Sequence, residues 1–149
     1  MNNSQFVNNK ALIGGGGAIH SVLGNMQINT SLFRNNQAMR PGYSGAIYSD
    51  GTLADRINGY SILRKSRFFN NSGEGQGGAV FLYLYPHQTG SKGLIEECEF
   101  IGNKVVADQK GDALGGDRAW YKLDGVLSDL CDFAKCPLTY SSLRWSRVE

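Results

Sequence analysis

Charge, proline and cysteine are scarce in this chain, and long apolar runs are absent. Charged residues make up 19% of the 149 residues and apolar residues 41%, so the composition lacks the high charge typical of disorder. The 15 Lys and Arg against 13 Asp and Glu leave a formal net charge of +2, with no basic cluster to predict a nucleic-acid partner. No apolar run approaches the ~18 residues of a membrane-spanning helix. We therefore expect a globular chain without a transmembrane segment.

The small numbers of prolines and cysteines argue against a Pro-rich linker and against a zinc-binding protein. Three prolines argue against a Pro-rich linker. Cys98, Cys131 and Cys136 cannot all pair within one chain, and they lack the C-x-x-C spacing of a zinc site, so their disulfide state stays open. We expect no metal site and no cofactor. The first residues, MNNSQFVNN, also lack the basic and apolar regions of a signal peptide.

Glycine, in contrast, is abundant. The 20 glycines are about twice the usual ~7% share and predict many turns. The stretch IGGGGAIHS, residues 13–21, raises the alternative of a phosphate-binding loop. Such a loop needs a helix after the glycines, whereas AIHSVLG lacks helical periodicity. A repeat explains the stretch better.

A pattern of several positions occurs four times in the chain. Each copy has Phe followed three residues later by Asn, and after a further 8 to 10 residues an Ala, preceded by Gly in the first three copies. The Phe and Asn positions are Phe6 and Asn9, Phe33 and Asn36, Phe68 and Asn71, and Phe100 and Asn103. The glycine and alanine positions are Gly17 and Ala18, Gly45 and Ala46, Gly78 and Ala79, and finally Ala113 after Asp112. Before each Phe stand a small residue (Ser4, Ser31, Ser66, Cys98) and, further upstream, an apolar one (Met1, Ile28, Leu63, Ile95).

This period predicts a solenoid whose coils stack on one another. Each copy offers two or three short strands that cannot bury their apolar side chains alone, so successive copies pair in parallel. We expect Phe on Phe, Ala on Ala and Ser on Ser. The Asn three residues after each Phe suits a left-handed corner, and stacked asparagines can bond to one another. The Gly before each Ala allows positive φ and close approach of neighbouring coils.

The paired motif carries a resemblance to a known family. The segments FRNNQAMRPGYSGAIYS and FFNNSGEGQGGAVFLYL resemble the repeat of chlamydial polymorphic outer-membrane proteins and related right-handed parallel β-helix proteins of the pectin-lyase-like type. The resemblance covers roughly residues 1–116, and the fourth copy departs from the pattern at Gly102 and Asp112. It implies a secreted, cell-surface or outer-membrane protein that acts in adhesion or as a structural shaft.

The last residues break the pattern. We assign residues 1–117 to the repeats and residues 118–149 to a C-terminal cap or poorly ordered tail. Apolar residues at mostly helical spacing after Ala119, with Pro137 beyond them, predict an amphipathic helix that covers the last coil. At the other end, Met1 falls on an apolar repeat position, so we interpret the chain as starting inside a coil and expect self-association through exposed coil ends.

Catalysis in a β-helix would require clustered carboxylates with a base, as in polysaccharide lyases and glycoside hydrolases. No such cluster is visible in the sequence, and we expect no catalytic residues. The scattered candidates are Asp50, Asp55, Asp108, Asp112, Asp117, Arg64 and Lys65. His20 has no partner within its segment. The carbohydrate-active enzyme stays an alternative.

Loops after the alanine strands are the better place for binding, because loops on a rigid scaffold commonly carry function. The second supplies Tyr48 and Asp50, and the third supplies Tyr83, Tyr85 and His87. If both loops project from the same edge of the solenoid, these residues would form a patch that binds glycans or host cell-surface proteins. Alternatively, the alternate tyrosines simply pack on the two sides of a strand. We thus expect an all-β, right-handed parallel β-helix of about four coils, with a non-catalytic structural or adhesive role.

Overall fold

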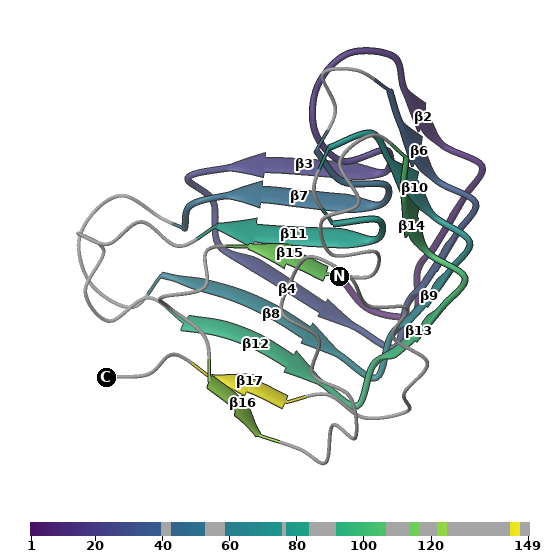
Figure 1. Cartoon of the computed structure of the whole chain (residues 1–149). Helices are drawn as coiled ribbons and strands as arrows, with labels where there is room; N and C mark the ends of the chain where they lie inside the picture. Colours follow the sequence, from purple (N-terminus) through teal and green to yellow (C-terminus); the bar gives the residue numbers. More distant parts are fainter. Residues whose placement is uncertain are drawn as a thin grey trace.

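The computed structural model describes residues 1–39, 43–52, 59–75, 77–83, 92–106, 114–116, 122–124 and 144–146. The regular elements in these ranges are strands, and the described residues contain no helix (Figure 1). Loops expected to vary in length, at 53–58 and 84–91, lie outside them, as does Ala113. Most of the repeats, but only six residues of the predicted C-terminal segment, are therefore described.

The chain passes through four sheets in a fixed order. β1 (Gln5–Val7), β2 (Lys10–Ala11) and β3 (Ile19–Val22) are followed by β4 (Met26–Asn29), β5 (Leu32–Arg34), β6 (Gln37–Ala38) and β7 (Ile47–Asp50). The same order continues with β8 (Tyr60–Arg64), β9 (Arg67–Phe69), β10 (Ser72–Gly73), β11 (Val80–Tyr83), β12 (Lys92–Glu96), β13 (Glu99–Ile101), β14 (Lys104–Val105) and β15 (Leu114–Gly116). The sheets are β1-β5-β9-β13, β2-β6-β10-β14, β3-β7-β11-β15 and β4-β8-β12.

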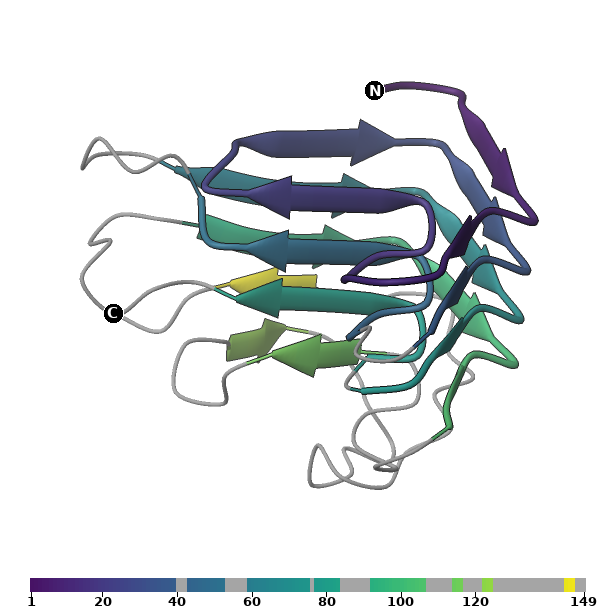
Figure 2. The same ribbon diagram turned by 90° about the horizontal axis from the view of Figure 1, so that it is seen from above.

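Corresponding strands of successive turns lie on one another (Figure 2). All pairings among β1 to β15 are parallel. The predicted all-β architecture of stacked parallel strands is confirmed and is that of a β-solenoid. The expectation of two or three strands per copy was too low, because the chain also forms two-residue strands such as β6 directly after each Asn corner.

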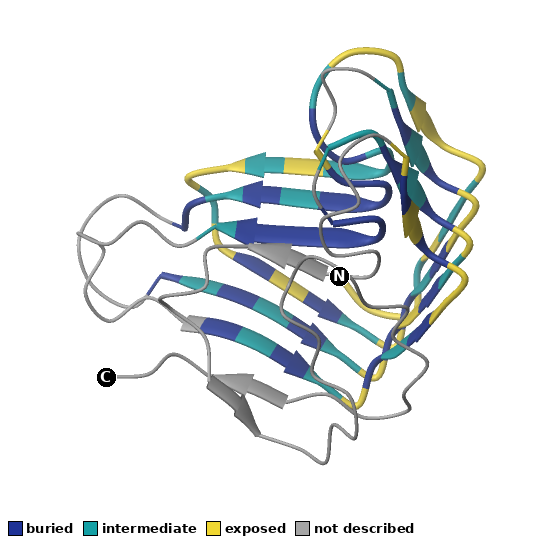
Figure 3. Ribbon diagram, in the orientation of Figure 1, coloured by how far each residue is buried: buried dark blue, intermediate teal, exposed yellow. Residues whose placement is uncertain are grey.

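Stacked phenylalanines fill the interior, in the register predicted from the repeat. Phe6 pairs with Phe33, Phe33 with Phe68, and Phe68 with Phe100. Their rings stack at centroid distances of 4.7, 4.8 and 4.7 Å. Phe33, Phe68 and Phe100 are fully buried, whereas Phe6 on the edge strand β1 is only partly buried. In Figure 3 the edge strands β2 and β3 are likewise coloured as exposed or intermediate.

The repeated asparagines form a ladder, in which Asn36, Asn71 and Asn103 are buried and Asn9 is exposed. Asn9 Nδ2 donates to Asn36 Oδ1, Asn36 Nδ2 to Asn71 Oδ1, and Asn71 Nδ2 to Asn103 Oδ1, at 2.9, 2.9 and 2.8 Å. The expected left-handed backbone belongs instead to the residue before each of them: Asn8, Asn35 and Asn70 have φ of 58°, 55° and 52°, and Gly102 has φ of 64°. The chain turns there so that the next amide can point inward.

The repeat glycines have a different role from the expected one. Gly17 and Gly45 do not have positive φ; the left-handed residues are the preceding Gly16 and, in the third copy, Gly77. A Cβ at Gly17 would meet the carbonyl oxygen of Gly45 and lie 2.6 Å from that of Gln37. Close approach of backbones is therefore the reason that glycine is required at these positions.

The C-terminal segment contains a strand where a helix was predicted. Lys122–Asp124 form β16, which pairs antiparallel with β17 (Arg144–Ser146). A helical period over neighbouring residues gives no sign of a backbone partner some 20 residues further along the chain. The rest of the predicted helix lies outside the described residues.

Candidate binding surface

The outer face of the sheet β3-β7-β11 collects the predicted binding residues. In β7, Ile47 and Ser49 are buried while Tyr48 and Asp50 are half-buried, as expected where side chains alternate across a sheet. Tyr48 pairs in register with His20 and Phe81, and Asp50 with Val22 and Tyr83. Parallel stacking thus brings Tyr48, Asp50 and Tyr83 onto one face.

Four rings on this face form a column across three strands. The centroid of Tyr48 lies 4.9 Å from that of His20 in an edge-on contact and 5.3 Å from that of Phe81 in a stacked one. Tyr43, which precedes β7, stacks on Tyr48 at 5.4 Å and also contacts Phe81 at 5.8 Å. We call His20, Tyr43, Tyr48 and Phe81, together with Asp50 and Tyr83, the aromatic face.

The four-glycine stretch packs against the aromatic face. A Cβ at Gly15 would meet the ring of Tyr48 and lie 2.7 Å from its Cβ, and a Cβ at Gly14 would lie 3.9 Å from His20 Nδ1. Glycine therefore lets the loop between β2 and β3 pass close beside the column. Of the two glycines that exceed the repeat, Gly15 is required by this close contact, whereas Gly14 is favoured by its positive φ of 107°.

Accessibility varies across the aromatic face. Tyr43 keeps 46% of its surface exposed and His20 is exposed, while Phe81 retains only 8% beneath its neighbours. Sequence reasoning missed Tyr43, Phe81 and the role of His20. The signal for His20 and Phe81 was the position that they share with Tyr48, two residues after each repeat Ala, whereas Tyr43 lies outside the repeat pattern. Tyr85 and His87 lie outside the described residues.

The scattered catalytic candidates do not converge among the described residues. Arg64 Nε donates to Glu96 Oε2 at 2.8 Å, and Lys65 Nζ lies 3.8 Å from Glu97 Oε2. Asp50 is on the aromatic face, on a different sheet. Asp55, Asp108, Asp112 and Asp117 are outside the described ranges. Over the part of the chain that is described, no three His, Cys, Asp or Glu side chains group as a metal site.

Cys98 continues the serine column in the interior. Its thiol donates to the Glu96 carbonyl oxygen at 3.4 Å, as the Ser66 hydroxyl donates to that of Arg64 at 2.8 Å. Burial raises the pKa of the Cys98 thiol from 9.0 to about 11. The group is therefore a protonated structural thiol at neutral pH.

In the described ranges, no helix combines the length and the hydropathy needed to cross a membrane. Residues 3–22, which contain β1, β2 and β3, match the family model described as "Chlamydia polymorphic membrane protein (Chlamydia_PMP) repeat". No solved structure matches the chain.

Two curated proteins are similar to larger parts of the chain. "Metabotropic glutamate receptor-like protein P" of Dictyostelium discoideum is 36% identical over 104 residues, which is 69% of this chain and 6% of that protein. "Probable autotransporter YfaL" of Escherichia coli (strain K12) is 34% identical over 86 residues, which is 53% of this chain and 7% of that protein. The chain thus spans less than a tenth of either relative, and the repeat match and the autotransporter similarity fit a polymorphic-membrane-protein-like repeat.

Proposed function

We propose that this chain is a non-catalytic structural and adhesive segment of a secreted or cell-surface protein, folded as a right-handed parallel β-helix of about four coils. The match of residues 3–22 to a polymorphic membrane protein repeat and the similarity to a probable autotransporter support an outer-membrane or surface location. The stacked parallel sheets support a rigid shaft.

The aromatic face is the observation that carries the adhesive role. Its rings are held by a sheet paired on both sides of β7, so little side-chain freedom is lost on binding. Tyrosines combine an apolar ring with a polar hydroxyl, which suits sugar rings and protein surfaces alike. Asp50 and Tyr83 supply polar groups beside the column. We propose glycans or host cell-surface proteins as the partners.

Binding of the purified chain to immobilised glycans and to host cells tests this role. The double variant Tyr43→Ala and Tyr83→Ala leaves the inner rings of Tyr48 and Phe81 in place. We expect it to lose about tenfold in affinity. Tyr60→Ala is the matched control, because Tyr60 is a half-buried tyrosine on the outer face of another sheet. Unchanged binding of the double variant would contradict adhesion through the aromatic face.

The non-catalytic assignment has its own test. Two observations support a non-catalytic role. Arg64 is paired with Glu96, and Asp50 lies on a different sheet from both residues. Incubation with pectin and related polyanionic glycans should release no unsaturated or reducing ends. Their release would make the carbohydrate-active enzyme the better assignment.

We also propose that copies of this chain associate through the edge formed by β1, β2, β3 and β4. These are the edge strands of their sheets. Leu12 and Ile13, which follow β2, are 66% and 82% exposed, and Val22 in β3 is 59% exposed. A lysine on an edge strand opposes such pairing. Val22→Lys should therefore reduce the mass measured by light scattering, whereas Val106→Lys, at a similarly exposed valine after β14, should not. A monomeric unmodified chain would contradict this proposal.

A further inference from the structure

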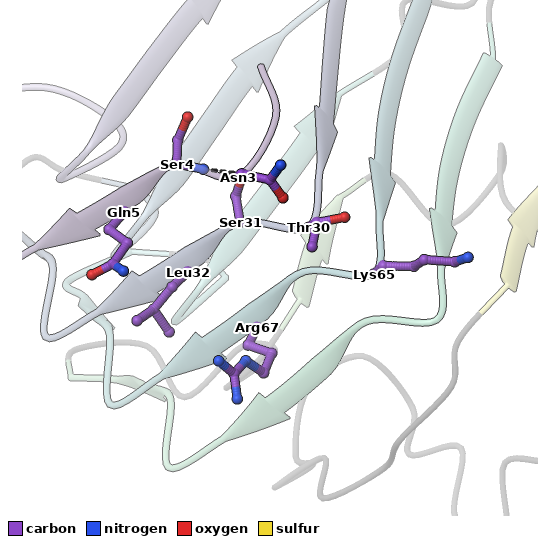
Figure 4. A pocket seen from close by; sticks show the side chains of 8 residues that line it. All are labelled: Asn3, Ser4, Gln5, Thr30, Ser31, Leu32, Lys65 and Arg67. Atoms are coloured by element: carbon purple, nitrogen blue, oxygen red, sulfur yellow. Dashed lines mark hydrogen bonds between the residues drawn. The ribbon is translucent and has the colours of Figure 1, made fainter.

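A polar hollow lies at the corner where β4 and β8 lead into β5 and β9 (Figure 4). Its volume is about 250 Å³. The residues that line it come from three successive turns: Asn3, Ser4, Gln5, Thr30, Ser31, Leu32, Lys65 and Arg67. It lies on different sheets from the aromatic face.

The repeat explains why polar side chains gather here. Asn3, Thr30 and Lys65 are the left-handed corner residues of their turns, with φ of 49°, 51° and 48°, and all three are exposed. Two residues later, Gln5, Leu32 and Arg67 pair in register on the outer face, because the neighbouring Phe of each strand points inward. Two parallel columns of side chains therefore flank the hollow.

The lining has a single sign of charge. Lys65 and Arg67 are cationic, and none of the eight lining residues is acidic. Asn3, Gln5 and Thr30 add exposed amides and a hydroxyl, while the Ser4 and Ser31 hydroxyls are engaged with the carbonyl oxygens of Asn2 and Asn29. Glu97 and Glu99 belong to the next turn and are not among the lining residues. The hollow thus offers neutral donors on two turns and cations on the third.

Both cations are available to a ligand. Arg67 forms no ion pair with a described carboxylate, although Glu99 is its in-register neighbour on β13; its guanidinium lies over the ring of Phe69, 5.8 Å from the centroid. Lys65 Nζ is 3.8 Å from Glu97 Oε2, but both side chains are more than half exposed, so water screens this pair. Figure 4 shows Lys65, in the loop between β8 and β9, and Arg67, at the start of β9, extending in different directions.

We propose that this hollow binds an acidic oligosaccharide, with Arg67 and Lys65 on its carboxylate or sulfate groups and Asn3, Gln5 and Thr30 on its hydroxyls. Guanidinium groups bind such planar or multivalent oxyanions through two donors at once. Because the side chains of Lys65 and Arg67 extend in different directions, they suit an extended oligosaccharide with several acidic groups better than one small anion. The three turns span about 10 Å at the ordinary strand spacing, which suits a ligand lying along the solenoid. The proposal deepens the adhesive role above and rests on it.

The test compares two double variants that remove the same charge. Lys65→Gln with Arg67→Gln alters the hollow, whereas Arg34→Gln with Lys104→Gln removes two exposed cations outside it. The probes are a heparin-derived hexasaccharide, a hexamer of galacturonate, neutral maltohexaose and poly-glutamate, measured by calorimetry at 150 mM salt. Melting temperatures of both variants verify that they are folded.

We expect the unmodified chain to bind at least one of the two acidic hexasaccharides and not maltohexaose, and the hollow variant to lose about tenfold in affinity or more. The control variant should stay within about twofold, since exposed charges elsewhere act only through screened long-range attraction. Equal losses in both variants, no binding of either acidic sugar, or tighter binding of poly-glutamate would overturn the proposal. If only the Tyr43→Ala and Tyr83→Ala double variant lost affinity for the acidic hexasaccharides, the proposed site in the hollow would be overturned. Adhesion through the aromatic face would then stand.

Discussion

Asn71 Oδ1 accepts two hydrogen bonds from Asn36, one from its side-chain amide at 2.9 Å and one from its backbone N–H at 3.0 Å. The Asn71 amide in turn donates to Asn103 Oδ1 at 2.8 Å and to the Phe33 carbonyl oxygen at 3.1 Å. Asn36 and Asn71 are fully buried. One side chain therefore satisfies polar groups on the turns before and after its own.

Replacing Asn71 tests this ladder. Asn71→Ala leaves two buried donors of Asn36 without an acceptor, and we expect a loss of about 3 kcal/mol or more in the free energy of unfolding. Denaturant titration followed by circular dichroism measures it. The exposed neighbour is the control: Asn70→Gly keeps the left-handed backbone at φ 52° and should change stability by less than about 1 kcal/mol. Equal effects would contradict the ladder.

The phenylalanine stack gives a second prediction. Phe68→Ala removes a fully buried ring between Phe33 and Phe100 and should cost about 3–5 kcal/mol. Phe68→Leu, which keeps most of the volume, should cost about 1–2 kcal/mol and remain folded. Phe69→Ala, on the outer face of the same strand, is the matched control and should cost least. A cost for Phe69→Ala as large as that for Phe68→Ala would contradict the inward stack.

Gly45 provides a test of backbone packing. A Cβ there would meet the Gly78 carbonyl oxygen and lie 2.5 Å from the Ser72 nitrogen, so Gly45→Ala must push two turns apart. We expect a loss of about 3 kcal/mol or more. At Gly24 the nearest atom to such a Cβ is the Ser21 hydroxyl at 2.9 Å, which can rotate away. Thermal melting should show little change for Gly24→Ala, and a similar drop in both variants would argue against the packing role.

Cys98 predicts a specific alkaline instability. Its pKa is raised by burial to about 11, so the folded chain holds this proton more tightly than the unfolded chain does. The resulting contribution to stability is complete below pH 9.0 and is lost as pH rises towards about 11. Cys98→Ser restores the serine of the other turns and should remove this part of the pH dependence. Parallel stability curves for the two proteins between pH 8 and 11 would contradict it.

The repeat made the stacking of the turns predictable, but not the number of strands in each turn or the strand pairing in the C-terminal segment. Phe6, Phe33, Phe68 and Phe100 recur in equivalent surroundings, and their register follows from the spacing alone. The two-residue strands were missed because they are too short to show alternation. The pairing of β16 with β17 was missed because it joins residues some 20 positions apart that share no motif.

The candidate surfaces were less accessible to sequence reasoning. Tyr48, Asp50 and Tyr83 could be named because they follow the repeat alanines, but Tyr43 lies outside the pattern and joins them only by stacking on Tyr48. The polar hollow combines single residues from three turns, none unusual in its own segment. No local motif marks such a site.

The amino-acid sequence by itself determined the stacking. Repeated Phe, Asn, Ser and Ala positions lower the free energy only when like residues meet, so they select parallel strands and their register. The tertiary structure alone decided which Asn of each pair turns the chain, why glycine precedes Ala, and which side chains share an outer face. Those properties depend on distances between backbones of neighbouring turns, and residues 27 to 35 positions apart become neighbours only after the turns have stacked.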